Sequence, residues 1–240
     1  MKIFQTNENS FIVELENIIS PEINEKIIHL KNELEKKDYI INTFNAYNSL
    51  YAEFDIIKTN FGNIKNIVEK YLINFNYKKL KNRIIYNVPV CYEPNFAIDI
   101  DFVAKYNNLN INDVIKLHTE PLYKIYFLGF TPGFPYLGGL NDKINAPRLE
   151  TPRKKIEKGS VGIAGNQTGI YSVNSPGGWR LIGKTPINLF NKSSKKPSIF
   201  EAGNFIKFYS ISLSEYDYIK HNVEKGTYDL KIEMINLWKK

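Results

Sequence analysis

Glycine is concentrated in one stretch of the chain, and this stretch most constrains what the chain can fold into. Of the 14 Gly residues, 11 lie between Gly129 and Gly183. Glycine is used where the backbone needs a positive φ or where another group must approach the backbone closely. Such a density predicts many tight turns between short strands, or a surface built largely from backbone.

Three of the four Arg residues lie in the same stretch: Arg148, Arg153 and Arg180. The guanidinium is a planar fork that binds carboxylate or phosphate through two hydrogen bonds, a geometry that Lys lacks. Two interpretations remain open: recognition of an anion by at least one of these Arg, or pairing with Glu150 or Glu157 and with loop carbonyls. Arg153 is the first choice for an anion site, because it lies between a proline and two lysines, where a rigid loop concentrates positive potential.

The composition favours an ordinary globular protein. With 240 residues, 43% of them hydrophobic and 14% aromatic, the chain can form one large domain or two small ones, each with a core. The net charge of +7 invites a nucleic-acid interpretation, but the Lys excess is spread along the chain together with many Asn and Ile. We therefore expect a solvated basic surface and no nucleic-acid partner.

Cys91 is the single cysteine, so no internal disulfide and no cysteine-based metal site is expected. It follows Val88-Pro89-Val90, and we expect it to pack as a small hydrophobic residue. The first residues lack the apolar core of a signal peptide, and no run of about 18 apolar residues is present to span a membrane. The expectation is a cytoplasmic protein without a membrane partner.

The first 88 residues alternate between strand and helix patterns, in the order strand, helix, strand, strand, helix, strand. Ser20-Pro21 marks the start of the first helix, because Ser caps a helix and Pro fits its first position. The order predicts an α+β fold that begins with a ferredoxin-like domain over residues 1–88, with two helices on one face of an antiparallel sheet. The strand patterns are 10–15, 39–44, 50–54 and 83–88, and the helix patterns are 21–36 and 64–72.

From residue 89 onward, two short helices are followed mainly by short strands. Asn110 caps the second of these helices, with Asp113 at its third position as in a capping box. Gly or Pro turns separate the β-rich runs, which is typical of an antiparallel barrel or sandwich. Residues 89–240 are therefore expected to form a second, β-rich domain. The β-rich runs are 122–128, 161–164, 169–173, 179–182, 205–210 and 227–235.

His118 lies at the end of the second of these helices, immediately before the strand pattern at 122–128. A histidine in the last turn often stabilises the carbonyl end of a helix. The same position leads into the glycine-rich stretch, where the imidazole would act as a proton carrier or a hydrogen-bond donor. Both roles remain open, and His118 is kept as a candidate catalytic residue.

The motifs of the glycine-rich stretch indicate a family. They include Gly129-Phe130-Thr131-Pro132-Gly133-Phe134-Pro135-Tyr136 and Ser175-Pro176-Gly177-Gly178-Trp179-Arg180. With them the chain resembles, over its whole length, the family of the 5-oxoprolinase B subunit, also called allophanate hydrolase subunit 1 or the carboxyltransferase C/D domain. The family includes a Kip-type inhibitor of a sporulation histidine kinase. The resemblance implies a small α/β domain followed by a cyclophilin-like β-barrel domain.

The resemblance also implies a function. The B subunit pairs with a second cyclophilin-like protein, the C subunit, and works with the A subunit to open 5-oxo-L-proline to L-glutamate at the expense of ATP. ATP and Mg²⁺ are expected at the level of the complex, since this chain has no phosphate loop of the Gly-Lys-Ser/Thr kind. The chain would then be one component of an ATP-hydrolysing enzyme and inactive alone. An alternative from a different class is a non-catalytic protein that inhibits a sensor histidine kinase.

The chemistry of the family indicates which residues to expect at a site. Transfer of a phosphoryl group to the lactam oxygen would activate the ring for attack by water, and it needs cationic forks and backbone N–H groups. The candidate catalytic residues are His118, Arg153 and Arg148, and no metal ligand is expected. The candidate substrate-binding residues supply amides, hydrogen bonds or aromatic walls: Thr131, Gly133, Phe134, Gln167, Thr168, Tyr171, Trp179 and Arg180. For Trp179, packing in the barrel core is an equally open interpretation.

Overall fold

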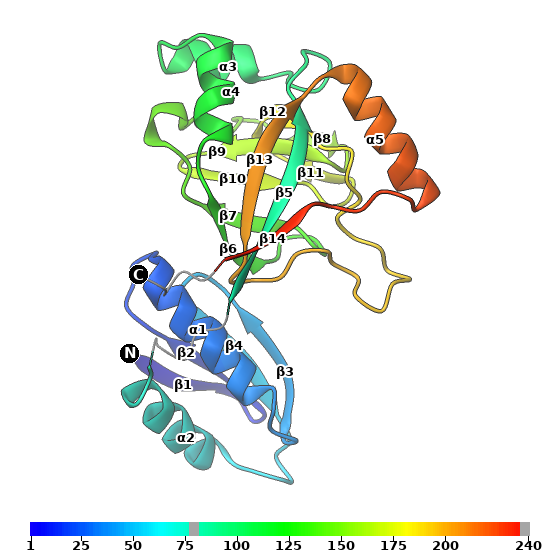
Figure 1. The fold of residues 1–240 in the computed structure, drawn as a ribbon. Coiled ribbons are helices and arrows are strands. Elements are labelled where there is room, and N and C mark those ends of the chain that lie inside the picture. Colours follow the sequence, from blue (N-terminus) through cyan, green and yellow to red (C-terminus); the bar gives the residue numbers. More distant parts are fainter. Residues whose placement is uncertain (77–81, 236–240) are drawn as a thin grey trace. The chain divides into compact units, whose positions relative to one another are not determined.

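The structure, a computed structural model, describes residues 1–76 and 82–235. Backbone contacts divide the chain into two units, with the division between Lys81 and Asn82. The blue and cyan elements of Figure 1 form the first unit, and the green to red elements form the second. Every residue of the glycine-rich stretch belongs to the second unit.

The first unit is a four-stranded antiparallel sheet with two helices. The strands follow the order β1-β2-β4-β3 across the sheet, and they span Lys2–Asn7 (β1), Ser10–Glu14 (β2), Ile40–Asn45 (β3) and Ser49–Phe54 (β4). The helices span Pro21–Leu34 (α1) and Phe61–Ile73 (α2). As the sequence predicted, Ser20 caps α1, and its hydroxyl accepts a hydrogen bond from the Ile23 amide at 3.2 Å.

Both helices cover the same face of this sheet. Alternate residues of β2 and β4 point to one side, because side chains in a strand alternate between its two faces. On that side Phe11 and Leu50 are buried together with Leu30 of α1 and Ile64 of α2. This shared core explains why the helix pattern and the strand pattern each carry only one apolar face.

The ferredoxin-like domain predicted for residues 1–88 is not confirmed. Its expected last strand, 83–88, lies in β5 (Arg83–Cys91), whose strand partners all belong to the second unit. The edge beside β2 is instead occupied by β1, which the sequence did not predict because its residues are almost all exposed and show no apolar alternation. The expected boundary between residues 88 and 89 therefore falls inside a strand.

The second unit contains the remaining elements. Its strands after β5 span Tyr123–Leu128 (β6), Pro135–Gly138 (β7), Arg153–Ile156 (β8), Ser160–Ala164 (β9), Gln167–Ile170 (β10), Ser175–Gly177 (β11), Arg180–Lys184 (β12), Phe205–Ile211 (β13) and Ile232–Ile235 (β14). Its helices span Ile100–Tyr106 (α3), Ile111–Thr119 (α4) and Leu213–Lys225 (α5), with a 3₁₀ turn at Asp142–Ile144 (η2).

Seven strands of this unit close into a barrel. Neighbours follow in the order β12, β9, β10, β7, β6, β13 and β5, and a pairing between Lys184 of β12 and Cys91 of β5 closes the ring. β13 and β5 run parallel, whereas the other pairs of the ring run antiparallel. This confirms the barrel that the short β-rich runs predicted.

Local predictions for the second unit are confirmed as well. Asn110 and Asp113 form the expected capping box at the start of α4. Cys91 is buried, and burial raises the pKa of its thiol, as expected for a packed residue rather than a reactive one. Across both units, the described helices include none with the length and hydropathy that a membrane span requires.

Replacing Gly159 by Ala should destabilise the second unit more than replacing Gly165. Both glycines have positive φ, 85° and 56°, so each substitution introduces backbone strain. A Cβ on Gly159 would lie 2.5 Å from the carbonyl oxygen of Thr185, whereas one on Gly165 meets nothing within 4 Å. We expect the free energy of unfolding in urea to fall by about 1 kcal/mol for Gly165→Ala and by more than about 3 kcal/mol for Gly159→Ala. Equal losses would contradict the close approach at Thr185.

Candidate functional site

A cavity of about 240 Å³ opens in the second unit, and we call it the aromatic cavity. All of its lining residues lie between positions 130 and 179, so the glycine-rich stretch builds it. The lining consists of Phe130, Phe134, Tyr136, Arg148, Pro152, Tyr171, Pro176, Gly177, Gly178 and Trp179. Four of these, Phe134, Arg148, Tyr171 and Trp179, were predicted as site residues from the sequence.

The wall of the aromatic cavity is a cluster of rings packed edge to face. The Phe134 ring lies 5.4 Å from both the Tyr171 and the Trp179 ring, at interplanar angles of 82° and 84°. Edge-to-face pairs are favoured because the positive ring edge meets the negative ring face. Phe134, Tyr171 and Trp179 are all buried, so they are both core residues and cavity wall.

Phe130 stands at the cavity in a strained conformation that the sequence analysis did not reveal. Its φ is 64°, and its side chain is 61% exposed. A bulky aromatic residue in the left-handed region costs about 1–3 kcal/mol and persists where its surroundings hold it there. The ring is held against the edges of Phe134, at 5.6 Å, and Tyr171, at 6.5 Å. Such strain is typical of binding sites, and the exposed ring is available to a ligand or a partner.

Arg148 supplies the one charge of the described cavity lining. Its side chain is exposed, and within the described residues its guanidinium forms no hydrogen bond or ion pair. Burial raises the pKa of Tyr136 and Tyr171, and the positive charge of Arg148 opposes both shifts. The two hydroxyls therefore stay neutral at neutral pH, while the guanidinium is placed to bind an anion in the cavity.

Arg153 and Arg180 are instead engaged with Asp99, a buried residue that the sequence analysis did not single out. Arg153 Nη2 donates to Asp99 Oδ1 at 2.8 Å, and Arg180 Nη1 lies 3.9 Å from the same oxygen. Arg180 Nε also donates to the Pro147 carbonyl, and its guanidinium lies 3.6 Å from the centre of the Phe102 ring. Neither Arg lines the aromatic cavity. These contacts agree with the second interpretation of the sequence, in which the Arg residues pair with a carboxylate and with loop carbonyls. The carboxylate is Asp99 and not the expected Glu150 or Glu157.

His118 of α4 and Thr168 of β10 are buried against each other, and neither lines the aromatic cavity. Thr168 donates its one hydroxyl hydrogen to the Gly162 carbonyl, so its oxygen accepts a hydrogen bond from His118 Nε2 at 3.0 Å. The other ring nitrogen, Nδ1, then accepts from the Tyr92 hydroxyl at 2.7 Å. Burial lowers the pKa of His118 to about 3, so the imidazole stays neutral. A neutral, enclosed imidazole fits a structural role.

The other predicted residues lie beside the cavity or on the barrel. Thr131 and Gly133 belong to the Phe130 loop, where the Thr131 hydroxyl lies 3.3 Å from that of Ser172. Gln167 begins β10. In the described residues no group of three or more His, Cys, Asp or Glu side chains is arranged to hold a metal ion.

The comparison with family models places this barrel protein in a class. Residues 1–200 match the model described as "Carboxyltransferase domain, subdomain C and D". The chain therefore belongs to the carboxyltransferase subdomain C and D family.

Curated relatives narrow this class. The chain is 37% identical over 237 residues to the 5-oxoprolinase B subunit of Bacillus subtilis, which covers 94% of this chain and 98% of that protein. It is 34% identical over 208 residues to the 5-oxoprolinase B subunit of Haemophilus influenzae, covering 87% and 97%. The family expected from the glycine-rich motifs is thus confirmed.

A solved structure supports the fold. The crystal structure of the Kluyveromyces lactis urea carboxylase matches with a TM-score of 0.77 and 21% identity, over 97% of this chain. The chain spans about a quarter of that protein, 24% of its length. At this identity the match shows the fold alone.

The stability of the protein should fall with acid because of His118. Its folded pKa of about 3 lies below the ordinary value of 6.5, so below about pH 6.5 the unfolded chain takes up a proton that the folded protein does not. Above about pH 6.5 the imidazole is neutral in both states, and the free energy of unfolding keeps its full value. As the pH falls from there towards 3, the free energy of unfolding decreases by about 1.4 kcal/mol per pH unit. The measurement is the free energy of unfolding in urea between about pH 7 and pH 5.

His118→Asn should flatten this slope, and the exposed His221 provides the matched control, His221→Asn, which should not. A second readout needs no variant. In the wild-type protein, the His118 ring signal in an NMR titration should not move between about pH 7 and pH 5. An inflection near pH 6.5 would contradict the enclosed, neutral imidazole.

Proposed function

We propose that this chain is the B subunit of an ATP-dependent 5-oxoprolinase complex that opens 5-oxo-L-proline to L-glutamate. The match to curated B subunits over nearly their whole length supports the proposal. The single observation that links the family to this chemistry is the aromatic cavity, which is lined by aromatic rings and by one guanidinium, that of Arg148, without a partner among the described residues. These features complement a small ring that bears a carboxylate.

The aromatic cavity suits the substrate in size and in kind. Its volume of about 240 Å³ admits a five-membered lactam. In this proposal Arg148 binds the substrate carboxylate through its planar fork, and the aromatic lining of the cavity holds the ring. In the same proposal the exposed ring of Phe130 helps to exclude water from the cavity once the partner protein has docked. The residues of this chain therefore bind and orient the lactam.

The remaining chemistry is assigned to the assembled complex. A lactam carbonyl is a weak electrophile, and ATP supplies the phosphoryl group that makes it reactive. The described residues offer no cluster of metal ligands, so we expect Mg²⁺ to enter with the nucleotide. The partners in this proposal are the C and A subunits of 5-oxoprolinase, and they complete the open side of the cavity.

The isolated chain is expected to show no 5-oxoprolinase activity. The complete complex with the A and C subunits should release glutamate from 5-oxoproline in the presence of Mg-ATP. The measurement is a glutamate-release assay on the chain alone, on each pairwise combination and on the full set. Full activity of the chain alone would contradict the multi-subunit proposal, and an inactive full set would favour the non-catalytic, kinase-inhibiting alternative.

Arg148 and Arg153 should respond differently to the same substitution. Lys keeps the charge but loses the fork, so Arg148→Lys should lower the turnover of the complex about 30- to 1000-fold, equivalent to about 2–4 kcal/mol. The melting temperature should not change, since Arg148 is exposed and unpaired among the described residues. Arg153→Lys should lower stability by about 1 kcal/mol through its contact with Asp99 and leave turnover within about threefold.

These two variants serve as controls for each other, because both keep the net charge of the same stretch. Loss of turnover without loss of stability in Arg153→Lys would restore Arg153 as the anion site. Full turnover in Arg148→Lys would remove the carboxylate-binding role proposed for the cavity.

A further inference from the structure

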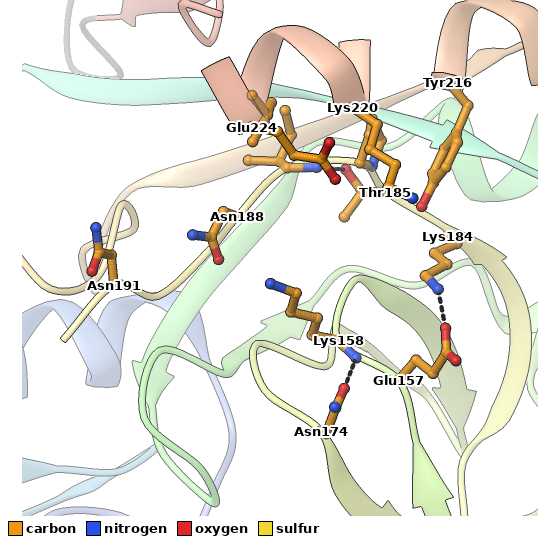
Figure 2. A pocket seen from close by; sticks show the side chains of 13 residues that line it. Glu157, Lys158, Asn174, Lys184, Thr185, Asn188, Asn191, Tyr216, Lys220 and Glu224 are labelled. Carbon is orange, nitrogen blue, oxygen red and sulfur yellow. Dashed lines mark hydrogen bonds and ion pairs between the residues drawn. The ribbon is translucent and has the colours of Figure 1, made fainter. Parts of the chain in front are cut away.

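A second hollow in the barrel unit differs in chemistry from the aromatic cavity, and we call it the polar pocket. Its volume is about 550 Å³, within the range of small-molecule sites. Its walls are the turn at Glu157-Lys158, the segment that follows β12, and one face of α5 (Figure 2). No residue lines both hollows, so the polar pocket is a separate site.

Lysine side chains from different walls face the polar pocket. Lys158 comes from the turn, Lys184 from the end of β12 and Lys220 from α5. Lys184 forms an ion pair with Glu157, whereas within the described residues the ammonium groups of Lys158 and Lys220 form none. Lys184 and Lys220 both lower the pKa of Glu157, so that carboxylate is ionised and its charge is offset locally. Two ammonium groups remain available to an anion.

Tyr216 adds a neutral donor to this set. The residue is 5% exposed, yet its hydroxyl makes no hydrogen bond with the described residues and points into the polar pocket (Figure 2). Burial is the largest cause that raises the pKa of Tyr216, to about 12, so the hydroxyl keeps its hydrogen at neutral pH. The hydroxyl is open to the pocket, so its hydrogen is available to an acceptor oxygen of a ligand.

The amide of Asn174 completes a set of donors. Its Oδ1 accepts the Lys158 backbone N–H at 2.8 Å, so its NH₂ group is the part left to face a ligand. Two ammonium groups, a phenol and an amide NH₂ require a ligand rich in acceptor oxygens. Glu224, one turn beyond Lys220 on α5, is a second carboxylate of the pocket beside Glu157, and it suits a hydroxyl or amino group on the same ligand.

We propose that the polar pocket binds a nucleoside triphosphate, with its phosphates at Lys158, Lys220 and Tyr216 and its sugar towards Glu224. Phosphate chains supply acceptor oxygens only, and the sugar supplies the hydroxyl that Glu224 accepts. Lysines bind phosphate as point charges and need no phosphate loop. The choice of ATP as the nucleotide rests on the proposed function, whereas the site itself rests on the donor set. This chain would then hold the ATP that the complex uses.

The test is isothermal titration calorimetry of the purified full-length chain with ATP and with inorganic tripolyphosphate. We expect both to bind, and we expect the variant K158Q/K220Q to bind each at least about tenfold more weakly. The control variant K105Q/K116Q removes two exposed lysines of α3 and α4 and should bind like wild type. Tyr216→Phe keeps the ring against Phe96, where the ring centres lie 4.6 Å apart, and should weaken binding several-fold while the protein stays folded.

The outcomes distinguish failure of nucleotide binding at the polar pocket from failure of the proposed 5-oxoprolinase function. Absence of ATP and tripolyphosphate binding by the wild-type chain overturns the proposal, and so does binding that K158Q/K220Q leaves unchanged. Binding of L-glutamate or 5-oxoproline in place of ATP also overturns it. Because the readout is binding by this chain alone, the polar pocket can fail while the assembled complex remains an active 5-oxoprolinase. Equally, ATP can bind here even if the complex shows no activity on 5-oxoproline.

Discussion

The second unit depends on one buried carboxylate, that of Asp99. Its Oδ1 accepts from Arg153 at 2.8 Å and its Oδ2 from the Leu181 amide at 2.7 Å, while its own amide donates to the Leu181 carbonyl at 2.9 Å. A buried carboxylate is tolerated only when it is paired and hydrogen-bonded in this way. The contacts join the start of α3 to β8 and β12, and β12 begins directly after Trp179. Arg153 Nη1 also donates to the carbonyl of Trp179 at 3.4 Å, so this ion pair holds the backbone of a residue that lines the aromatic cavity.

The sequence predicted elements best where their hydrogen bonds are local. Ser20 and Asn110 cap their helices as expected, because each cap bonds to an amide three residues further on. The segment 83–88 was recognised as a strand but assigned to the wrong unit, since its partners lie far along the chain; Ile84 and Asn204, which share a hydrogen bond, are 120 residues apart. A strand pattern indicates which face is apolar and contains no information about the neighbouring strand.

Contacts between residues far apart in the chain also limit how much of the candidate site could be predicted. The glycine-rich stretch was predicted to build it, and all lining residues of the aromatic cavity fall there. The stretch does not distinguish Arg148 from Arg153, because the difference between them is a distant carboxylate, Asp99. His118 follows the expected helix pattern, but only the fold shows that its ring is buried and bonded to Thr168, 50 residues further along the chain. Phe130 was within a quoted motif, and its strain becomes visible only as a backbone angle.

The position of β5 in the barrel has a consequence for how the protein is made. β5 is the first strand of the ring in the chain, and its parallel partner β13 spans Phe205–Ile211. A ribosome adds about 5–20 residues per second, so β5 leaves it several seconds before β13 exists. The first unit has its own core and can fold during that interval, whereas the barrel must wait with an unpaired strand edge. During synthesis that edge is the part of the chain that a chaperone, or another nascent copy, would meet first.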